Sequence, residues 1–226
     1  MIYGLIFSAG KETRFKSNKP KALSLYNGTT ILDNNITNLK KYCDEIYVVC
    51  SHTNQHFFND YNKIVIDSGL GCGDAVMKAI SKLEFSSNDK CYIQWGDCLN
   101  SRIILDEICD IDCYDRVIIP CAIEDEPYVE LKQYGDKVKV LFSKYGEKTS
   151  KGYHDFGLFF SNISYLFSKL CEFAFKISTE NGYVHKHNNE MQFLDILNDA
   201  NTRAIIIEIN NYKSLSFNTI EELNNL

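Results

Sequence analysis

The chain has 226 residues, a formal net charge of −6 and an isoelectric point near 5.4. This charge argues against general affinity for nucleic acid or anionic lipid, because both partners are attracted by basic surface. A content of 45% hydrophobic and 24% charged residues is typical of a globular protein, and the length fits one large domain over residues 1–226.

The nine cysteines form no C-x-x-C pair, so the sequence indicates neither a zinc ribbon nor a thioredoxin-type motif. They lie mostly inside apolar runs, and we expect free, buried thiols in a reducing compartment. No apolar segment approaches the ~18 residues that a membrane span requires, and no basic region precedes the first apolar run. These observations predict a cytoplasmic protein that binds neither membrane nor nucleic acid.

Short apolar runs alternate with amphipathic stretches along the first half of the chain, which is typical of βα units around a mainly parallel sheet. In chain order the pattern predicts strands at 3–7, 45–50, 63–66 and 91–95, with helices at 31–42 and 71–83. Beyond residue 115, extended segments at 116–121, 128–133 and 137–142 predict an antiparallel excursion. The remaining expected elements are a strand at 157–161, helices at 163–177 and 190–197, a strand at 204–209 and a helix at 219–226.

The first predicted strand is followed by a loop of small residues that carries several cations. Ser8, Ala9 and Gly10 open the loop, and its cationic side chains are Lys11, Arg14, Lys16, Lys19 and Lys21. Backbone N–H groups at the end of a buried strand, combined with cationic side chains, form a site suited to phosphates. The alternative is an ordinary basic loop with a solvated face.

Asp97 follows Gly96 directly after the predicted strand 91–95. We therefore expect its carboxylate at the carboxyl edge of the sheet, where open α/β sheets bind their ligands. Sites of phosphoryl and nucleotidyl transfer hold Mg²⁺ with one or two carboxylates plus substrate phosphates, which makes Asp97 a candidate metal ligand. Because Gly-Asp is also a common turn sequence, a purely local role is the alternative.

The first loop resembles the signature of the nucleotidyltransferases that make nucleotide-activated sugars and alcohols, which reads strand, A-G-x-G-[ST]-R, then P-K-x-L. In that family the loop wraps a nucleoside triphosphate, the Arg withdraws charge from the β- and γ-phosphates, and the Lys reaches the phosphates or the incoming phosphate monoester. The resemblance assigns these roles to Arg14 and Lys21, and nucleotide contacts to Ser8–Lys11. One position departs from the family: its second Gly is Glu12 here, and a carboxylate beside a triphosphate should repel it.

A glycine-rich segment resembles the G-x-[GA]-x-A turn with which the same family opens a helix beneath the nucleobase. The resemblance implies nucleotide contacts by Gly71, Gly73 and Asp74, with Asp67 as a side-chain candidate just upstream. The alternative is a glycine-rich helix start with Asp74 near the positive end of the helix. The pattern leaves the base open among uracil, cytosine, thymine and guanine.

The end of the chain resembles the closing [ND]-[TS]-x-x-[DE]-L segment of the family, whose Asn or Asp supplies the second protein ligand to Mg²⁺. The resemblance implies a metal pair of Asp97 and Asn218. A carboxamide adds no charge, so this pair would bind the ion weakly without the nucleotide. A compatible alternative is a helix cap at Asn218 or Thr219.

The acceptor side is implied by two strand resemblances. Tyr128–Leu131 resembles the Y-G-x-[VI]-E strand, which assigns acceptor binding to Glu130, and 140–144 resembles the following F-x-E-K strand. In relatives with that second element the Lys contacts the acceptor phosphate, a catalytic role that falls on Lys144. The family's Glu before this Lys is Ser143 here, and Lys148 is an alternative cation.

Three further acceptor residues follow from the resemblance. The segment 154–160 resembles the N-x-G-[IL]-Y-x-[FL] strand, whose Gly, here Gly157, clears room for the acceptor. Asp155 stands near the usual Asn or Thr, and an edge strand with surface charge is the alternative for it. Glu190, with Asp195, is similar to the E-x-x-x-x-D of the acceptor-side helix, with ordinary helix amphipathicity as the alternative.

The resemblance covers nearly the whole chain and implies a fold and a reaction. The fold is a three-layer α/β/α sandwich of the GT-A and Rossmann-like kind, with a mostly parallel twisted sheet and a small antiparallel excursion. The reaction is Mg²⁺-dependent transfer of a nucleotide from a nucleoside triphosphate to a phosphate monoester, with a sugar 1-phosphate as the first candidate. The alternatives are a cytidylyltransferase that uses CTP and a phosphorylated alcohol or amine such as phosphocholine, and a catalytically inactive regulatory homologue, which Glu12 would favour.

Overall fold

The computed structural model describes most of the chain. The described residues are 1–10, 15, 17–67, 69–143, 146–147, 150–180, 182–184, 189–210, 212, 215–217 and 219–224. Several residues singled out in the sequence lie outside these ranges, namely Lys11, Glu12, Arg14, Lys16, Lys144, Lys148 and Asn218. The roles predicted for them rest on the sequence alone.

One half of the central sheet is parallel. Its strands lie in the order β5 (Lys63–Ile66), β4 (Glu45–Ser51), β1 (Ile2–Phe7) and β6 (Lys90–Trp95), and all run in the same direction. Parallel strands are covered on both faces, so they read as continuous apolar runs, and the predicted bounds of these four strands are confirmed to within one residue.

The other half of the sheet is largely antiparallel. It continues from β6 through β12 (Leu158–Asn162), β8 (Val117–Asp125), β11 (Lys151–Asp155), β9 (Val129–Tyr134) and β10 (Lys137–Phe142), while β15 (Ala204–Glu208) pairs in parallel with β8. The α/β class with a parallel core is confirmed, and the antiparallel part is larger than the expected excursion. The added strand is β11, for which the sequence gave a strand signal only at the last two residues, His154 and Asp155, and no apolar pattern.

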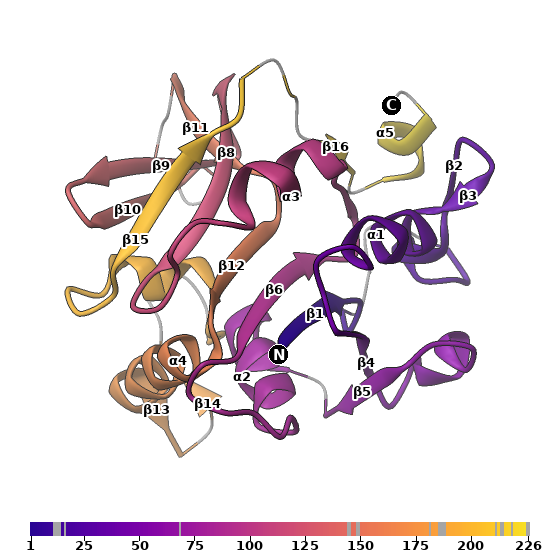
Figure 1. The fold of residues 1–226 in the computed structure, drawn as a ribbon, viewed down its shortest axis with the longest axis horizontal. Helices are drawn as coiled ribbons and strands as arrows, with labels where there is room; N and C mark the ends of the chain where they lie inside the picture. Colours follow the sequence, from indigo (N-terminus) through magenta and orange to yellow (C-terminus); the bar gives the residue numbers. More distant parts are fainter. Residues whose placement is uncertain are drawn as a thin grey trace.

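Helices cover both faces of the sheet (Figure 1). Because successive side chains of a strand point to opposite faces, Leu5 of β1 packs in a core with α2 (Cys72–Ile80) and α4 (Ile163–Ile177). Ile6 packs in a second core with α1 (Ile31–Leu39) and α3 (Arg102–Ile108). These two cores form the expected three-layer α/β/α sandwich. No helix in the described ranges is both long and apolar enough to span a bilayer.

Short elements connect these layers. They are the 3₁₀ turns η1 (Lys21–Leu23), η2 (Gln55–Phe58) and η4 (Leu194–Asn198), the helix α5 (Ile220–Asn224), and the strand pairs β2 (Leu25–Tyr26) with β3 (Thr29–Thr30), β13 (Ser178–Thr179) with β14 (Gly182–Tyr183), and β7 (Cys98–Leu99) with β16 (Leu215–Ser216). The helix predicted at 190–197 is wrong in type and bounds, since this segment holds η4 instead. All nine cysteines are free, and Cys171 is exposed rather than buried.

Candidate active site

The carboxyl ends of the parallel strands meet at one edge of the sheet, and the first loop begins there. Ser8 follows β1, and its N–H donates to the Val49 carbonyl of β4 at 2.8 Å. Gly96 follows β6, and its N–H donates to the Phe7 carbonyl at 2.9 Å. A Cβ on Gly96 would lie 2.7 Å from that carbonyl oxygen, so only glycine lets the two strand exits approach this closely. The chain thus places the first loop and Asp97 side by side.

Lys21 and Asp97 form an ion pair at this edge. The η1 turn begins after Pro20, whose carbonyl accepts the Leu23 N–H at 2.9 Å. This turn directs Lys21 inward, so that the residue is only 7% exposed and its Nζ lies 3.2 Å from Oδ2 of Asp97. The structure therefore brings together the two residues that the sequence assigned to phosphate and metal chemistry.

The C-terminal segment also reaches this edge. Ser216 of β16 pairs with Cys98, the residue after Asp97, and Leu215 pairs with Leu99. The ring of Phe217 packs on Phe15 of the first loop, with centroids 5.7 Å apart. Asn218 is the next residue in the chain and lies outside the described residues, but the backbone that leads to it runs beside Asp97.

The donor set at this edge suits a cation shared with a substrate. The Asp97 side chain is 33% exposed and offers one carboxylate. Within the described part of the chain, no group of three or more His, Cys, Asp or Glu residues could hold a metal ion. Mg²⁺ is commonly bound by one or two carboxylates plus substrate phosphates rather than by an all-protein cage, so Asp97 fits that mode of binding.

The glycine-rich turn before α2 packs against another part of the chain. Gly71 has φ +103°, and a Cβ there would lie 2.4 Å from the Met191 carbonyl oxygen. The Gly73 N–H donates to the same carbonyl at 2.8 Å, and the Met191 N–H donates to the Leu70 carbonyl at 2.7 Å. These glycines therefore have a structural use, namely close approach of the segment around Met191. Their contact with a nucleobase stays a prediction.

The two acidic residues assigned to the nucleotide lie in different surroundings. Asp74 is only 2% exposed. Its Oδ2 accepts the Leu70 N–H at 2.9 Å and lies 2.8 Å from Lys78 Nζ. Its Oδ1 accepts a hydrogen bond from the Tyr183 hydroxyl at 2.8 Å. Its carboxylate thus holds the start of α2. The Asp67 side chain is 84% exposed and lies 3.3 Å from Nε2 of His52, at the ends of β5 and β4.

On the acceptor side, Gly157 lies against the end of β6. It has φ +66°, and a Cβ there would lie 2.4 Å from Cys98 Sγ and 2.9 Å from Trp95 Cδ1. The residue therefore gives the chain its close approach to the strand end that leads to Asp97. Burial, followed by the charges of Asp97 and Asp155, raises the pKa of the Cys98 thiol, so this neighbour is uncharged.

Asp155 is buried within the sheet, and the edge-strand alternative for it is wrong. Its strand β11 lies between β8 and β9, and the residue is only 7% exposed. Oδ1 of Asp155 accepts the Gly157 N–H at 2.8 Å. Burial raises the pKa of this carboxyl, although the neighbouring His154 and the Gly157 hydrogen bond oppose the shift. Asp155 thus fixes the turn into β12 from inside the protein.

The two glutamates assigned to the acceptor differ in exposure. Glu130 is only 5% exposed; its side chain fills the space over Gly152, where a Cβ would lie 2.5 Å from Glu130 Cγ, and it lies 3.3 Å from Lys132 Nζ. Glu190 is exposed and accepts the Gln192 side-chain amide at 3.0 Å. Their contact with an acceptor stays a prediction.

The sequence did not single out His154 and Glu124, which lie beside Asp155. Nδ1 of His154 is 2.9 Å from Oε2 of Glu124. Burial lowers the pKa of His154, but the Glu124 hydrogen bond and the Asp155 charge outweigh it and raise this pKa above its usual value. The run of acidic residues Glu124–Glu126 is a sequence signal that could have pointed to this cluster.

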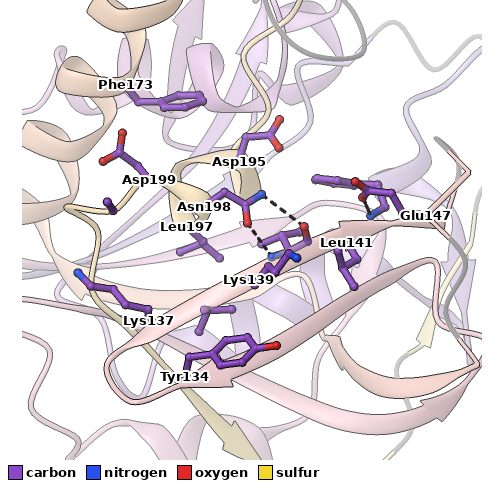
Figure 2. Close-up of a pocket in the computed structure, with 14 residues that line it drawn as sticks. Tyr134, Lys137, Lys139, Leu141, Glu147, Phe173, Asp195, Leu197, Asn198 and Asp199 are labelled. Atoms are coloured by element: carbon purple, nitrogen blue, oxygen red, sulfur yellow. Dashed lines mark hydrogen bonds between the residues drawn. The ribbon is translucent and has the colours of Figure 1, made fainter.

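A groove of about 600 Å³ lies beside β10 (Figure 2), and neither Lys21 nor Asp97 is among the residues that line it. Figure 2 shows Asn198 of η4 reaching across it to the strand. Asn198 Oδ1 accepts the Val140 N–H at 2.9 Å and its Nδ2 donates to the Val140 carbonyl at 3.4 Å. Glu147 accepts the Phe142 N–H at 2.6 Å. Asn198 and Glu147 thus form hydrogen bonds with main-chain groups on the outer edge of β10, which limits the pairing of this strand with other strands.

The fold and the site define the class of protein: an α/β protein whose parallel strands present a basic loop and a carboxylate at one edge. The sequence matches the MobA-like NTP transferase domain over residues 4–132, more than half of the chain, and the protein belongs to this family of nucleotidyltransferases.

Curated relatives match part of the chain. The Bifunctional protein GlmU of Ruthia magnifica subsp. Calyptogena magnifica is 33% identical over 101 residues, which are 42% of this chain and 22% of that protein. The Bifunctional protein GlmU of Francisella tularensis subsp. holarctica (strain OSU18) is 28% identical over 130 residues, 54% of this chain and 28% of that protein. The chain thus matches about a quarter of the length of these relatives.

Solved structures match the fold over nearly the whole chain. A protein from Bacillus anthracis assigned as a glucose-1-phosphate thymidylyltransferase gives a TM-score of 0.74 at 14% identity, covering 100% of this chain and 93% of that one. The inositol-1-phosphate CTP transferase from T. maritima gives 0.72 at 13%, covering 97% and 90%. The CTP:phosphocholine cytidylyltransferase from Streptococcus pneumoniae gives 0.70 at 14%, covering 99% and 96%. Similarity at this level of identity establishes the fold.

Proposed function

We propose that this protein, as a single domain over residues 1–226, joins a nucleoside triphosphate to a phosphate monoester and releases pyrophosphate. The observation that carries the proposal is the contact of Lys21 Nζ with Asp97 Oδ2, 3.2 Å apart at the carboxyl edge of the parallel strands. Family membership supports the reaction class, and the position of the pair is the one at which α/β sheets bind ligands.

The proposed chemistry needs no side-chain nucleophile, because the phosphate monoester is already an anion. Its oxygen attacks the α-phosphorus, and the bond to the pyrophosphate leaving group breaks. The start of the first loop, Ser8–Lys11, would hold the phosphates through main-chain N–H groups from Ala9 onward, since the Ser8 N–H already donates to Val49. Lys21 and Arg14 would neutralise the charge that develops on the phosphates. Lys21 suits this role because it is buried, and a charge shielded from water acts more strongly on its neighbours.

A divalent cation fits the same edge. Mg²⁺, held by Asp97 and Asn218 together with substrate phosphates, would supply charge neutralisation between the two anionic reactants. Asp67, Gly71, Gly73 and Asp74 are the proposed nucleotide contacts at the ends of β5 and the start of α2.

For the acceptor we propose a sugar 1-phosphate first. Lys144 would contact its phosphate, and Glu130, Asp155, Gly157 and Glu190 would surround the rest. The fold similarity to a protein assigned as a glucose-1-phosphate thymidylyltransferase supports this choice. The second candidate is a phosphorylated alcohol or amine with CTP as donor. It is favoured by the buried carboxylate of Asp155 and by the fold similarity to two cytidylyltransferases of such acceptors.

Nucleotide binding tests this proposal and separates it from the inactive-homologue alternative. Trp95 is the only tryptophan, and its ring lies 5.7 Å from that of Phe7 at the base of the first loop, so its fluorescence reports on this edge. With Mg²⁺ present, at least one nucleoside triphosphate should bind saturably, and Lys21→Ala should weaken it by about tenfold or more. The exposed Lys40→Ala is the matched control. Absence of binding by the unchanged protein would contradict the proposal.

A further inference from the structure

The turn after β4 reaches across to the first loop through one side chain. Asn54 directly precedes η2 and lies forty-six residues away from Ser8 in the chain. Its Oδ1 accepts two hydrogen bonds from Ser51, from the main-chain N–H at 2.9 Å and from the hydroxyl at 3.0 Å. Its Nδ2 donates to the Ser8 carbonyl at 2.7 Å. The carboxamide therefore ties the end of β4 to the residue that opens the first loop.

This contact fixes the first peptide unit of the loop. The Ser8 N–H already donates to the Val49 carbonyl at 2.8 Å, so the Asn54 bond occupies the second main-chain group of the same residue. In a planar trans peptide the N–H points opposite to the C=O. Because the Ser8 carbonyl points toward Asn54, the Ala9 N–H of the same peptide unit points away from Asn54. The orientation of the Ser8–Ala9 peptide is therefore set before the chain reaches Gly10.

The Ser8 hydroxyl gives a second observation at the same place. Ser8 is only 4% exposed, and its Oγ has no hydrogen-bond partner among the residues that the structure describes. A buried hydroxyl without a partner is costly. The Asn54 side chain with its three hydrogen bonds, called the clamp below, thus holds in place a residue whose hydroxyl has no partner within the described ranges.

We propose that Asn54 is a positioning residue for the nucleoside triphosphate: it orients the Ser8–Ala9 peptide so that the loop amides face the phosphates. This inference rests on the proposed function and adds a residue that touches no reacting atom. Ser51 is only 3% exposed, which gives the clamp a rigid base at the end of β4. The strands β1 and β4 remain paired without the clamp, through their own register from Tyr3 with Glu45 to Phe7 with Val49.

Two variants separate positioning from simple loss of structure. Asn54→Ala removes all three side-chain hydrogen bonds. Asn54→Asp keeps an acceptor for Ser51 but places a second oxygen where Nδ2 now donates to the Ser8 carbonyl. The matched control is Gln55→Ala in the same turn, because the Gln55 side-chain amide donates to the His52 carbonyl at 3.3 Å, within the turn itself.

The measurements are the Kd of the nucleoside triphosphate by Trp95 fluorescence, the KM of each substrate and the melting temperature. We expect both Asn54 variants to raise the Kd and KM of the nucleotide by about tenfold. Their acceptor KM and melting temperature should stay close to those of the unchanged protein. Gln55→Ala should match the unchanged protein in all of these measurements. Nucleotide affinity equal to that of the unchanged protein would overturn the inference, and so would an equal rise in both KM values. Failure of the unchanged protein to bind any nucleotide would overturn the proposed function as well.

Discussion

The parallel and antiparallel halves of the sheet place their charged residues differently. In the parallel half, Lys21 and Asp97 lie in loops beyond the strand ends, and Asp97 is 33% exposed. In the antiparallel half, Glu130 and Asp155 lie within strands and are 5% and 7% exposed. Parallel strands all end at one edge, so their loops converge, whereas antiparallel strands alternate direction and separate successive loops. We therefore expect the proposed chemistry to depend on Lys21 and Asp97 beyond the parallel strands, whereas Glu130 and Asp155 also hold the fold.

The largest effect should come from Asp97→Ala. Loss of the carboxylate removes the proposed cation ligand and the ion pair with Lys21, so the rate of pyrophosphate release should fall by about 10³-fold. Because Asp97 lies in a loop, the melting temperature should change little. Steady-state pyrophosphate assays and thermal melts check both statements, with the exposed Asp110→Ala as the control. Near-normal turnover of Asp97→Ala would contradict the proposal that the chemistry depends on residues of the parallel half.

The next effect concerns stability in the antiparallel half. Gly157→Ala places a Cβ 2.4 Å from Cys98 Sγ at a φ of +66°, so the free energy of unfolding should fall by about 3 kcal/mol. Gly135→Ala separates the two causes, since Gly135 has φ +61° but nothing within 4 Å of the added Cβ. That control should cost about 1 kcal/mol, the backbone part alone. Equal losses in urea unfolding would refute the packing argument.

A smaller, pH-dependent effect is expected at Asp155. Burial raises the pKa of this carboxyl above its ordinary 3.8, so the folded state binds the proton more tightly than the unfolded state. As the pH rises from 3.8 through the folded pKa, the unchanged protein loses stability that an uncharged residue would not lose. Asp155→Asn retains an acceptor for the Gly157 N–H. The melting temperature of this variant relative to the unchanged protein should therefore be higher at pH 7 than at pH 4. A difference that does not grow with pH would contradict this account.

The smallest effect is local and lies at the far edge of the antiparallel half. Asn198→Ala removes both side-chain hydrogen bonds to Val140. The opening free energy at the Val140 amide should fall by about 1 kcal/mol in hydrogen exchange. Asn201→Ala, at an exposed position three residues on, is the control. An unchanged Val140 exchange rate would mean that the carboxamide does not protect this edge.

The sequence could predict those strands and helices whose apolar residues form a regular pattern. The strand Lys63–Ile66 and the helix Ile163–Ile177 have the predicted bounds, because their apolar residues recur with the period of the element. The strand Lys151–Asp155 has no such signal, since Lys, Gly, Tyr, His and Asp form no apolar run. Its pairing with β8 and β9 is a tertiary effect. The short helix Arg102–Ile108 gave too few turns for its period to be recognised.

The candidate site likewise contains residues that sequence motifs identified and residues whose contacts depend on the tertiary structure. Lys21 and Asp97 were singled out by motifs at strand ends, and the structure places them in contact because parallel strands share an edge. The burial of Asp74 could not be read from its position near a helix start, since Tyr183 reaches it from 109 residues away. Asn54 gave no motif at all; its contact with Ser8 depends on how the turn after β4 folds back.

The most direct test of the central claim is a matrix of the four nucleoside triphosphates against a panel of phosphate monoesters with Mg²⁺, scored by pyrophosphate release. The panel should include sugar 1-phosphates, phosphocholine and inositol 1-phosphate. We predict that at least one pair gives pyrophosphate and the nucleotide-activated product in equal amounts, and that Asp97→Ala abolishes the signal. Saturable nucleotide binding without pyrophosphate release from any pair would contradict the account and favour an inactive homologue.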